Sequence, residues 1–156
     1  MNDIVNIFKP SESEKHGIDL IREKDINILS VGISTAGSAE IEMTKKNPSS
    51  HIVATTIDEE GLEFTRNIIE QYGLESRIEL KIEDVSTKLP YSDEHFDFIY
   101  ARLVLHYLDN QRLKQTLKEI KRILKKDGLF YIVVRSRNEW EAKLEGTTYD
   151  ETTGIT

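Results

Sequence analysis

One stretch near the C-terminal end of the sequence constrains the fold of this chain more than any other. It begins with the apolar run FDFIY at 96–100, continues with apolar residues at helical spacing over 109–126, and ends with the run LFYIVV at 129–134. Two short apolar runs joined by an amphipathic helix are typical of parallel strands linked by a crossover helix. Ligands bind at the carboxyl ends of such strands, which here points to Ala101 and Arg102.

The same alternation of strand and helix extends through most of the chain. Apolar patterning predicts strands at 26–31, 51–57, 77–82, 96–100 and 129–134. Helical spacing, with Ser11 and Asp58 as caps, predicts helices at 11–24, 39–46, 59–72 and 109–126, and the pair Asp127–Gly128 is predicted to end the last of them. These elements predict an α/β fold with a doubly wound, mostly parallel sheet and helices on both faces.

Composition limits the classes of function that this chain can have. Its 156 residues suffice for one domain, and its hydrophobic fraction of 38% with 31% charged residues is that of a globular protein. A net charge of -7 disfavours binding to nucleic acid. No apolar run approaches the roughly 18 residues needed to cross a membrane. The N-terminus lacks a secretion-signal pattern, so we expect a cytoplasmic protein.

Metal sites are also disfavoured by the sequence. The chain has no cysteine, which excludes disulfides and thiolate metal ligands, and its four histidines show no ligand spacing. We therefore expect no metal ion.

The loop GISTAGS at 32–38 is the first candidate for a binding site. Small residues between a strand and a helix let the backbone approach a ligand and present free amide groups at the start of the helix. Gly32, Ser34 and Gly37 match the spacing of a dinucleotide fingerprint whose second glycine is replaced by serine, and Asp58 follows about 20 residues later. By itself this pattern fits an NAD-dependent enzyme, and it equally fits a plain turn between strand and helix.

Two longer segments resemble a known family. The sequences LPYSDEHFDFIYARLVLHYL at 89–108 and IKRILKKDGLFYIVV at 120–134 resemble the class I, Rossmann-like methyltransferases that use S-adenosyl-L-methionine (AdoMet) and act on small molecules. The resemblance covers roughly residues 18–134. It implies AdoMet as the cofactor and a small molecule as the partner. It also implies a set of cofactor-contacting residues, namely Gly32, Ser34, Gly37, Thr56, Ile57, Asp58, Asp84, Val85, Ala101 and Arg102.

Within that set the resemblance implies different roles. Asp84 corresponds to the acid that binds the adenine amino group, and Val85 would supply the neighbouring amide. Ala101 and Arg102 would flank the methionine end of AdoMet. The ribose acid of the family falls on Thr56, although Asp58 could take that role if the loop shifts by two residues.

Three positions depart from the family pattern. Ser30 stands where the family has an acid before the first glycine, Ser34 replaces the second glycine, and Thr56 replaces the ribose acid. A neutral hydroxyl binds ribose more weakly than a carboxylate, so we expect weakened AdoMet affinity. The leading hypothesis is a methyltransferase. The alternatives are a catalytically degenerate, methyltransferase-like binding module and, with less support, an NAD-dependent enzyme.

Methyl transfer from a sulfonium requires alignment more than catalytic side chains, so the sequence names no catalytic residue and no acceptor. We expect an AdoMet-binding domain at 1–134, beginning with a leader and helix at 1–24. Residues 135–156 would be a tail or the truncated start of a C-terminal segment, because the further C-terminal strands of the family are missing. The apolar strand at 129–134 would then have an unpaired edge, which predicts a homodimer through this edge or a tail folded across it.

Overall fold

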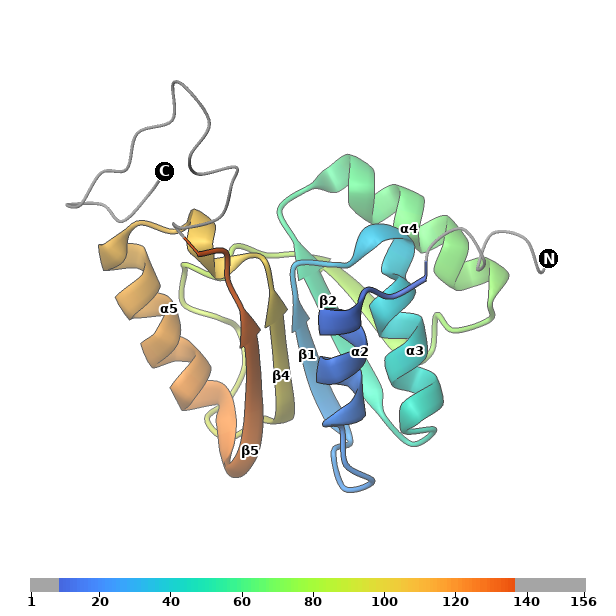
Figure 1. The fold of residues 1–156 in the computed structure, drawn as a ribbon, viewed down its shortest axis with the longest axis horizontal. Coiled ribbons are helices and arrows are strands. Elements are labelled where there is room, and N and C mark those ends of the chain that lie inside the picture. The colour runs from blue at the N-terminus through green and yellow to red at the C-terminus, as the bar shows by residue number, and fades with distance from the viewer. Residues whose placement is uncertain (1–8, 137–156) are drawn as a thin grey trace.

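A computed structural model describes residues 9–136 of the chain and contains a five-stranded parallel sheet with strand order β3-β2-β1-β4-β5 (Figure 1). The strands are β1 (Asn27–Val31), β2 (His51–Thr56), β3 (Ile78–Ile82), β4 (Phe96–Arg102) and β5 (Leu124–Val133). The chain starts at the centre of the sheet, winds outward to β3, and returns to place β4 and β5 on the other side of β1. The predicted doubly wound α/β fold is confirmed.

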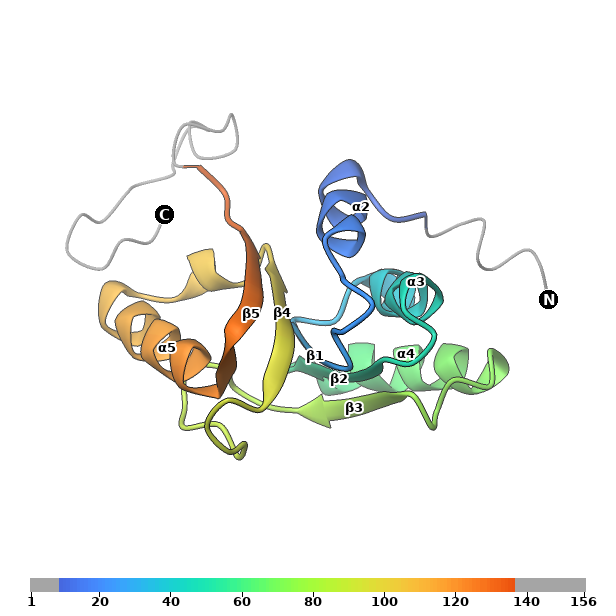
Figure 2. The same cartoon turned by 90° about the horizontal axis from the view of Figure 1, so that it is seen from below.

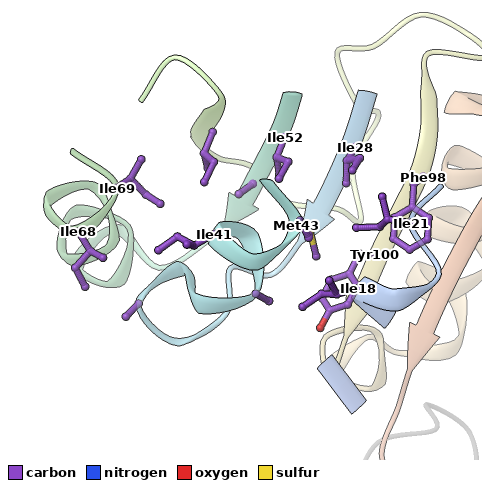
Figure 3. Packing of buried hydrophobic residues seen from close by; sticks show 14 residues of the cluster. Ile18, Ile21, Ile28, Ile41, Met43, Ile52, Ile68, Ile69, Phe98 and Tyr100 are labelled. Atoms are coloured by element: carbon purple, nitrogen blue, oxygen red, sulfur yellow. The ribbon is translucent and has the colours of Figure 1, made fainter. Parts of the chain in front are cut away.

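Helices cover both faces of the sheet, as predicted (Figure 2). The helices are α2 (Glu12–Asp19), α3 (Ser38–Lys46), α4 (Glu59–Gln71) and α5 (Asn110–Ile123), with short 3-10 turns η1 (Thr35–Gly37) and η2 (Leu105–Tyr107). Helices α2, α3 and α4 pack on one face, where Ile28, Ile52 and Phe98 of the sheet meet Met43 and Ile69 (Figure 3).

The opposite face is covered by α5. Leu29 and Ile99 of the sheet pack there against Ile120 and Ile123 of the helix, all 2% exposed or less. Consecutive strand residues thus face opposite layers, which explains why the strands read as nearly continuous apolar runs.

The first helix is shorter than the prediction of 11–24. Ser11 caps it as expected, in a capping box in which the Ser11 and Glu14 side chains each bind the other residue's backbone N–H. The helix ends at Asp19 because the following turn has its own hydrogen bonds. The Asp25 carboxylate, completely buried, accepts from the backbone N–H of Arg22 at 2.8 Å and from its guanidinium at 2.7 Å.

Strand β4 is longer, and β5 begins earlier, than predicted. Ala101 and Arg102 belong to β4 rather than to the loop after it. Helix α5 ends at Ile123, before Asp127–Gly128, because the Ile123 carbonyl accepts from the backbone N–H of His95 at 2.8 Å and leaves the helical pattern. The Asp127–Gly128 pair lies instead in an irregular part of β5, where the pairing shifts.

The described sheet ends at β5, which pairs only with β4 within residues 9–136. Its side chains Leu129 and Ile132 are 38% and 42% exposed. Residues 137–156 lie outside the described part, so a homodimer through this edge, or a tail across it, stays a prediction. No helix of the described residues is long and apolar enough to cross a membrane.

The loop 83–95, which leads from β3 to β4, is fixed to α5 by hydrogen bonds with Glu119 and Arg122, which form an ion pair on that helix. Glu119 accepts from the Leu89 backbone N–H at 2.6 Å and from Arg122 Nε at 2.6 Å. Arg122 also donates to the carbonyl of Tyr91 at 2.7 Å. The bond from Arg122 holds the pKa of Glu119 at about 2, well below its ordinary value. This loop is thereby anchored at one end of the sheet.

We predict that this ion pair contributes to stability in a pH-dependent way. Because the folded-state pKa of Glu119 lies below 4.5, its contribution is complete above pH 4.5 and is lost as the pH falls toward 2. Glu119→Gln should lower the free energy of unfolding by about 1 kcal/mol or more at pH 7. Urea unfolding at pH 7 and pH 3 should then differ less in this variant than in the parent.

Glu12→Gln is the matched control, because it breaks the ion pair with Lys15, in which the Glu12 side chain is 93% exposed. It should change stability little at either pH. If the two variants behave alike, the loop is not anchored by Glu119.

Candidate functional site

The loop after β1 packs directly against the segment after β4. Gly32 has φ +78°, and its N–H and that of Ile33 both donate to the Thr55 carbonyl, at 2.8 and 3.1 Å. A Cβ at Gly32 would overlap Cγ2 of Val104. This position therefore requires glycine both for its left-handed backbone and for the close approach of the two segments.

The second glycine of the predicted fingerprint has a packing role. Gly37 is buried with φ +68°, and a Cβ there would lie 3.0 Å from Cγ2 of Thr65 and 3.4 Å from Cδ1 of Ile69, both on α4. The neighbouring Ala36 is also left-handed, with φ 58°. Gly37 fits the loop against α4, and it does not line the cleft described below.

The two serines that depart from the family pattern bind one buried carboxylate. Ser30 Oγ donates to Oε1 of Glu40 at 2.7 Å, and Ser34 Oγ donates to Oε2 at 2.5 Å. Ser34 Oγ also accepts from the Ala39 N–H at 2.9 Å, at the start of α3. Glu40 is completely buried. The sequence does not single out this residue, because nothing in the pattern separates Glu40 from the half-exposed Glu42 on the same helix.

A cleft of about 450 Å³ opens between the ends of β1 and β4, where the strand order reverses. Segments from four parts of the chain line it, with the residues Lys9, Glu14, Gly32, Ile33, Ser34, Thr35, Ser38, Tyr100, Arg102, Leu103 and Val104. The predicted residues Gly32, Ser34 and Arg102 are thus brought together. Ala101 is not among them, because its side chain is completely buried in the core beneath α5.

Acidic, basic and hydroxyl groups meet in this cleft. Glu14 is 7% exposed, and its Oε1 lies 4.0 Å from Nη1 of Arg102. Ser13 connects α2 to β4 and β5. Its hydroxyl accepts from Arg102 Nε at 2.7 Å, and its carbonyl accepts from the Tyr131 hydroxyl at 2.6 Å. The Tyr100 hydroxyl is buried and makes no hydrogen bond within the described part of the chain.

The end of β2 holds the predicted ribose positions. Thr56 is the last residue of the strand, and its Oγ1 accepts from the Asp58 N–H at 3.1 Å. Asp58 caps α4, with Oδ1 accepting from the Gly61 N–H at 3.0 Å. Ile57 between them is 75% exposed. The carboxylate of Asp58 is therefore committed to the helix through one oxygen.

The predicted adenine position follows β3. Asp84 Oδ1 accepts from both the hydroxyl and the N–H of Ser86, at 2.7 and 2.9 Å, and these bonds lower the pKa of Asp84. Asp84 is exposed, whereas Val85 is 8% exposed and packs in the core. The strands are parallel, with Val31 beside Thr55 and Thr56 beside Ile82. The predicted positions after β1, β2 and β3 therefore all lie at the carboxyl end of the sheet.

Residues 9–136 contain no group of three or more His, Asp or Glu side chains that could hold a metal ion. The chemistry available at the cleft is that of carboxylates, a guanidinium, hydroxyls and backbone amides.

Comparison with known proteins assigns this arrangement to a family. A family model described as a methyltransferase domain matches residues 29–132. The chain belongs to the methyltransferase domain family. The demethylmenaquinone methyltransferase of Lactobacillus johnsonii is 30% identical over 102 residues, which cover 65% of this chain and 41% of the relative. The chain therefore spans less than half the length of this curated relative.

Solved structures share the fold. A SAM-dependent methyltransferase from Aquifex aeolicus is 22% identical with a TM-score of 0.68, over 82% of this chain and 66% of that one. The 4+2 cyclase SpnF is 20% identical with a TM-score of 0.69, over 97% of this chain and 50% of that one. Membership in the methyltransferase domain family implies AdoMet as the cofactor.

We predict that Gly32 is indispensable to this edge of the sheet. Gly32→Ala should lower the free energy of unfolding by roughly 2 to 4 kcal/mol, because it adds a clash with Val104 to the strain of a left-handed alanine. Gly73→Ala is the matched control, since Gly73 has φ +64° but nothing within 4 Å of an added Cβ. It should cost about 1 kcal/mol in the same chemical unfolding measurement. If both variants lost the same free energy of unfolding, Val104 would have to move aside at no cost.

Proposed function

We propose that this chain is the AdoMet-binding core of a methyltransferase that acts on a small molecule. The observation that carries the proposal is the cleft at the ends of β1 and β4, which combines a glycine-containing loop with the opposite charges of Glu14 and Arg102. AdoMet ends in an ammonium and a carboxylate next to a sulfonium cation. A cleft with one acid and one guanidinium matches that zwitterionic end.

The charges at the loop favour AdoMet over a dinucleotide. The completely buried Glu40 lies beneath the loop, and Glu14 lines the cleft, so a pyrophosphate would meet two carboxylates. Most loop amides are also already bonded within the protein, namely those of Gly32, Ile33, Ser34, Gly37 and Ser38. A phosphate-binding loop needs such amides free. These two features argue against the NAD-dependent alternative.

Individual residues take roles from the chemistry of their groups. Arg102 would bind the methionine carboxylate and Glu14 the ammonium, with the unpartnered Tyr100 hydroxyl as a further hydrogen-bonding group. Thr56 would bind the ribose. Asp84 would accept from the adenine amino group through Oδ2, since Oδ1 is held by Ser86.

The other predicted positions contribute through the backbone or through packing. Val85 would offer its N–H to the adenine, and Ile57 exposes an apolar side chain beside the ribose position. Ala101 could contact the ligand only through its backbone, because its side chain is buried in the core.

AdoMet supplies a methyl group that is already activated by the sulfonium. What these residues must do is hold the donor, exclude water and align an acceptor, and a base is needed only when the acceptor must lose a proton. We assign no catalytic residue and no particular acceptor. The cytoplasmic location, the absence of nucleic-acid binding and the homodimer through β5 belong to the same proposal.

A second candidate is a binding module of this fold that transfers no methyl group. The fold is compatible with other chemistry, since SpnF is a cyclase, and Thr56 offers a neutral hydroxyl where a carboxylate would bind ribose more strongly. Such a module would bind AdoMet without consuming it in the presence of any acceptor.

Calorimetric titration of the 156-residue protein tests the proposal. We expect binding of AdoMet and of its demethylated product, and no binding of NAD. Asp84→Asn should weaken both interactions roughly 5- to 150-fold, because a hydrogen-bonded amino group loses its acceptor, with little change in melting temperature. Asp127→Asn is the control, because that residue is 72% exposed and pairs with Lys24 at the start of β5, away from the cleft. A protein that binds NAD alone would contradict the proposal.

We also predict that Thr56→Asp tightens AdoMet binding about tenfold, because a carboxylate forms stronger hydrogen bonds with the ribose hydroxyls than a threonine does. The comparison variant is Asp58→Asn, which keeps a good helix cap while removing the charge. It should leave affinity unchanged. If instead Asp58→Asn weakens binding and Thr56→Asp has no effect, Asp58 is the ribose partner.

A further inference from the structure

The buried acid Glu40 differs from the other buried acids of the described chain in having no cationic partner. Asp25 pairs with Arg22 at 2.7 Å, and Glu14 lies 4.0 Å from Arg102. Among residues 9–136, no Lys, Arg or His forms an ion pair with Glu40. A buried carboxylate without a counter-ion is costly unless hydrogen bonds or a bound cation compensate it.

Three hydrogen bonds provide part of that compensation. They come from the hydroxyls of Ser30 and Ser34 and from the Ser34 N–H, which is 3.3 Å from Oε1. All three donors are neutral. The site therefore retains a net negative charge directly beneath the loop.

Ser34 connects the carboxylate of Glu40 to the cleft. It lines the cleft, and its hydroxyl contacts the carboxylate. Tyr100 also lines the cleft, and its buried hydroxyl senses the same charge. Burial, the charge of Glu14 and the charge of Glu40, in that order, raise the pKa of Tyr100. The charge of Glu40 thus reaches two residues of the cleft wall, Ser34 and Tyr100.

We propose that Glu40 is a positioning residue that makes the loop selective for a cationic ligand, favouring the sulfonium of AdoMet over its neutral thioether product. The inference rests on the proposed function. Ser30 and Ser34 hold the carboxylate beneath the loop, so the acid that is absent from the end of β1 is supplied by α3. The positive charge of the ligand would then balance the carboxylate of Glu40, which the three neutral donors compensate only in part.

The test is the ratio of affinities for AdoMet and its demethylated product, which differ in one positive charge. Calorimetry on the 156-residue protein should give AdoMet affinity at least comparable to that of the product. Glu40→Gln, which is nearly isosteric, should weaken AdoMet about tenfold and the product less than about threefold, as expected for one unit charge acting at an intermediate effective dielectric constant.

Two further variants separate charge from loop geometry. Ser34→Ala keeps the carboxylate and the backbone bond from residue 34 but removes the hydroxyl bond to the loop, so it should weaken both ligands by the same factor. The double variant Ser30→Asp with Glu40→Gln moves the carboxylate from α3 to β1 and should restore the ratio of the parent. If the role of Glu40 were merely structural, Glu40→Gln would change the affinities for AdoMet and for the product equally. The double variant with Ser30→Asp would then restore no preference for AdoMet.

Hydrogen exchange provides a measurement without ligand. Exchange of the Ser34 amide should accelerate in Glu40→Gln, because its acceptor is altered, while melting curves establish that each variant is folded. If Glu40→Gln does not fold, the parent protein and the transposed variant still decide the question.

A parent protein that prefers the neutral product more than about tenfold, or an unchanged ratio in a folded Glu40→Gln, would overturn this inference and leave AdoMet binding intact. A parent protein that binds neither ligand would overturn the proposed function itself.

Discussion

Hydrogen bonding of β1 on both sides is the constraint on which the rest of this structure depends. The strand pairs in parallel with β2 through Val31 and Thr55 and with β4 through Val31 and Ala101. Four of its five residues are buried, so its register cannot slip without exposing core side chains to water. That fixed register places the ends of three strands side by side, and the loop after β1 can then pack against Val104.

Much of this fold follows from sequence patterns with a direct physical cause. Apolar runs of strand length and helical repeats predict the doubly wound sheet and the helices on both faces, because each element must bury one face or both. The errors fall where tertiary hydrogen bonds override local preference. Asp127–Gly128 looks like a helix end, yet α5 already ends at Ile123 because the Ile123 carbonyl accepts from the N–H of His95, just before β4. The apolar run predicts a strand that ends at Tyr100, but β4 continues through Arg102.

The candidate site was harder to predict than the fold, because its groups interact across long sequence separations. Gly32 and Arg102 could be found from their places at strand ends. Glu14 could not, because only the packing of α2 against the sheet brings it to the cleft. Tyr100 could not either, because in the sequence it is one more residue of the apolar run of β4. In the sequence, Ser30 and Ser34 look like the loss of an acid and of a glycine that the family pattern has at these positions. In three dimensions they are hydrogen-bond donors to Glu40, which shows that a missing charge at one position can be supplied from another element.

The two hydrogen bonds of Ser13 imply that the cleft forms late during folding. Its carbonyl binds the hydroxyl of Tyr131, 118 residues away, and its hydroxyl binds Arg102, 89 residues away. Contacts of such long range form only after intervening chain entropy has been lost. On the ribosome, the wall contributed by α2 cannot be completed until β5 has been synthesised. A nascent chain therefore has the loop after β1 well before it has the cleft wall that Ser13 forms with Arg102 and Tyr131.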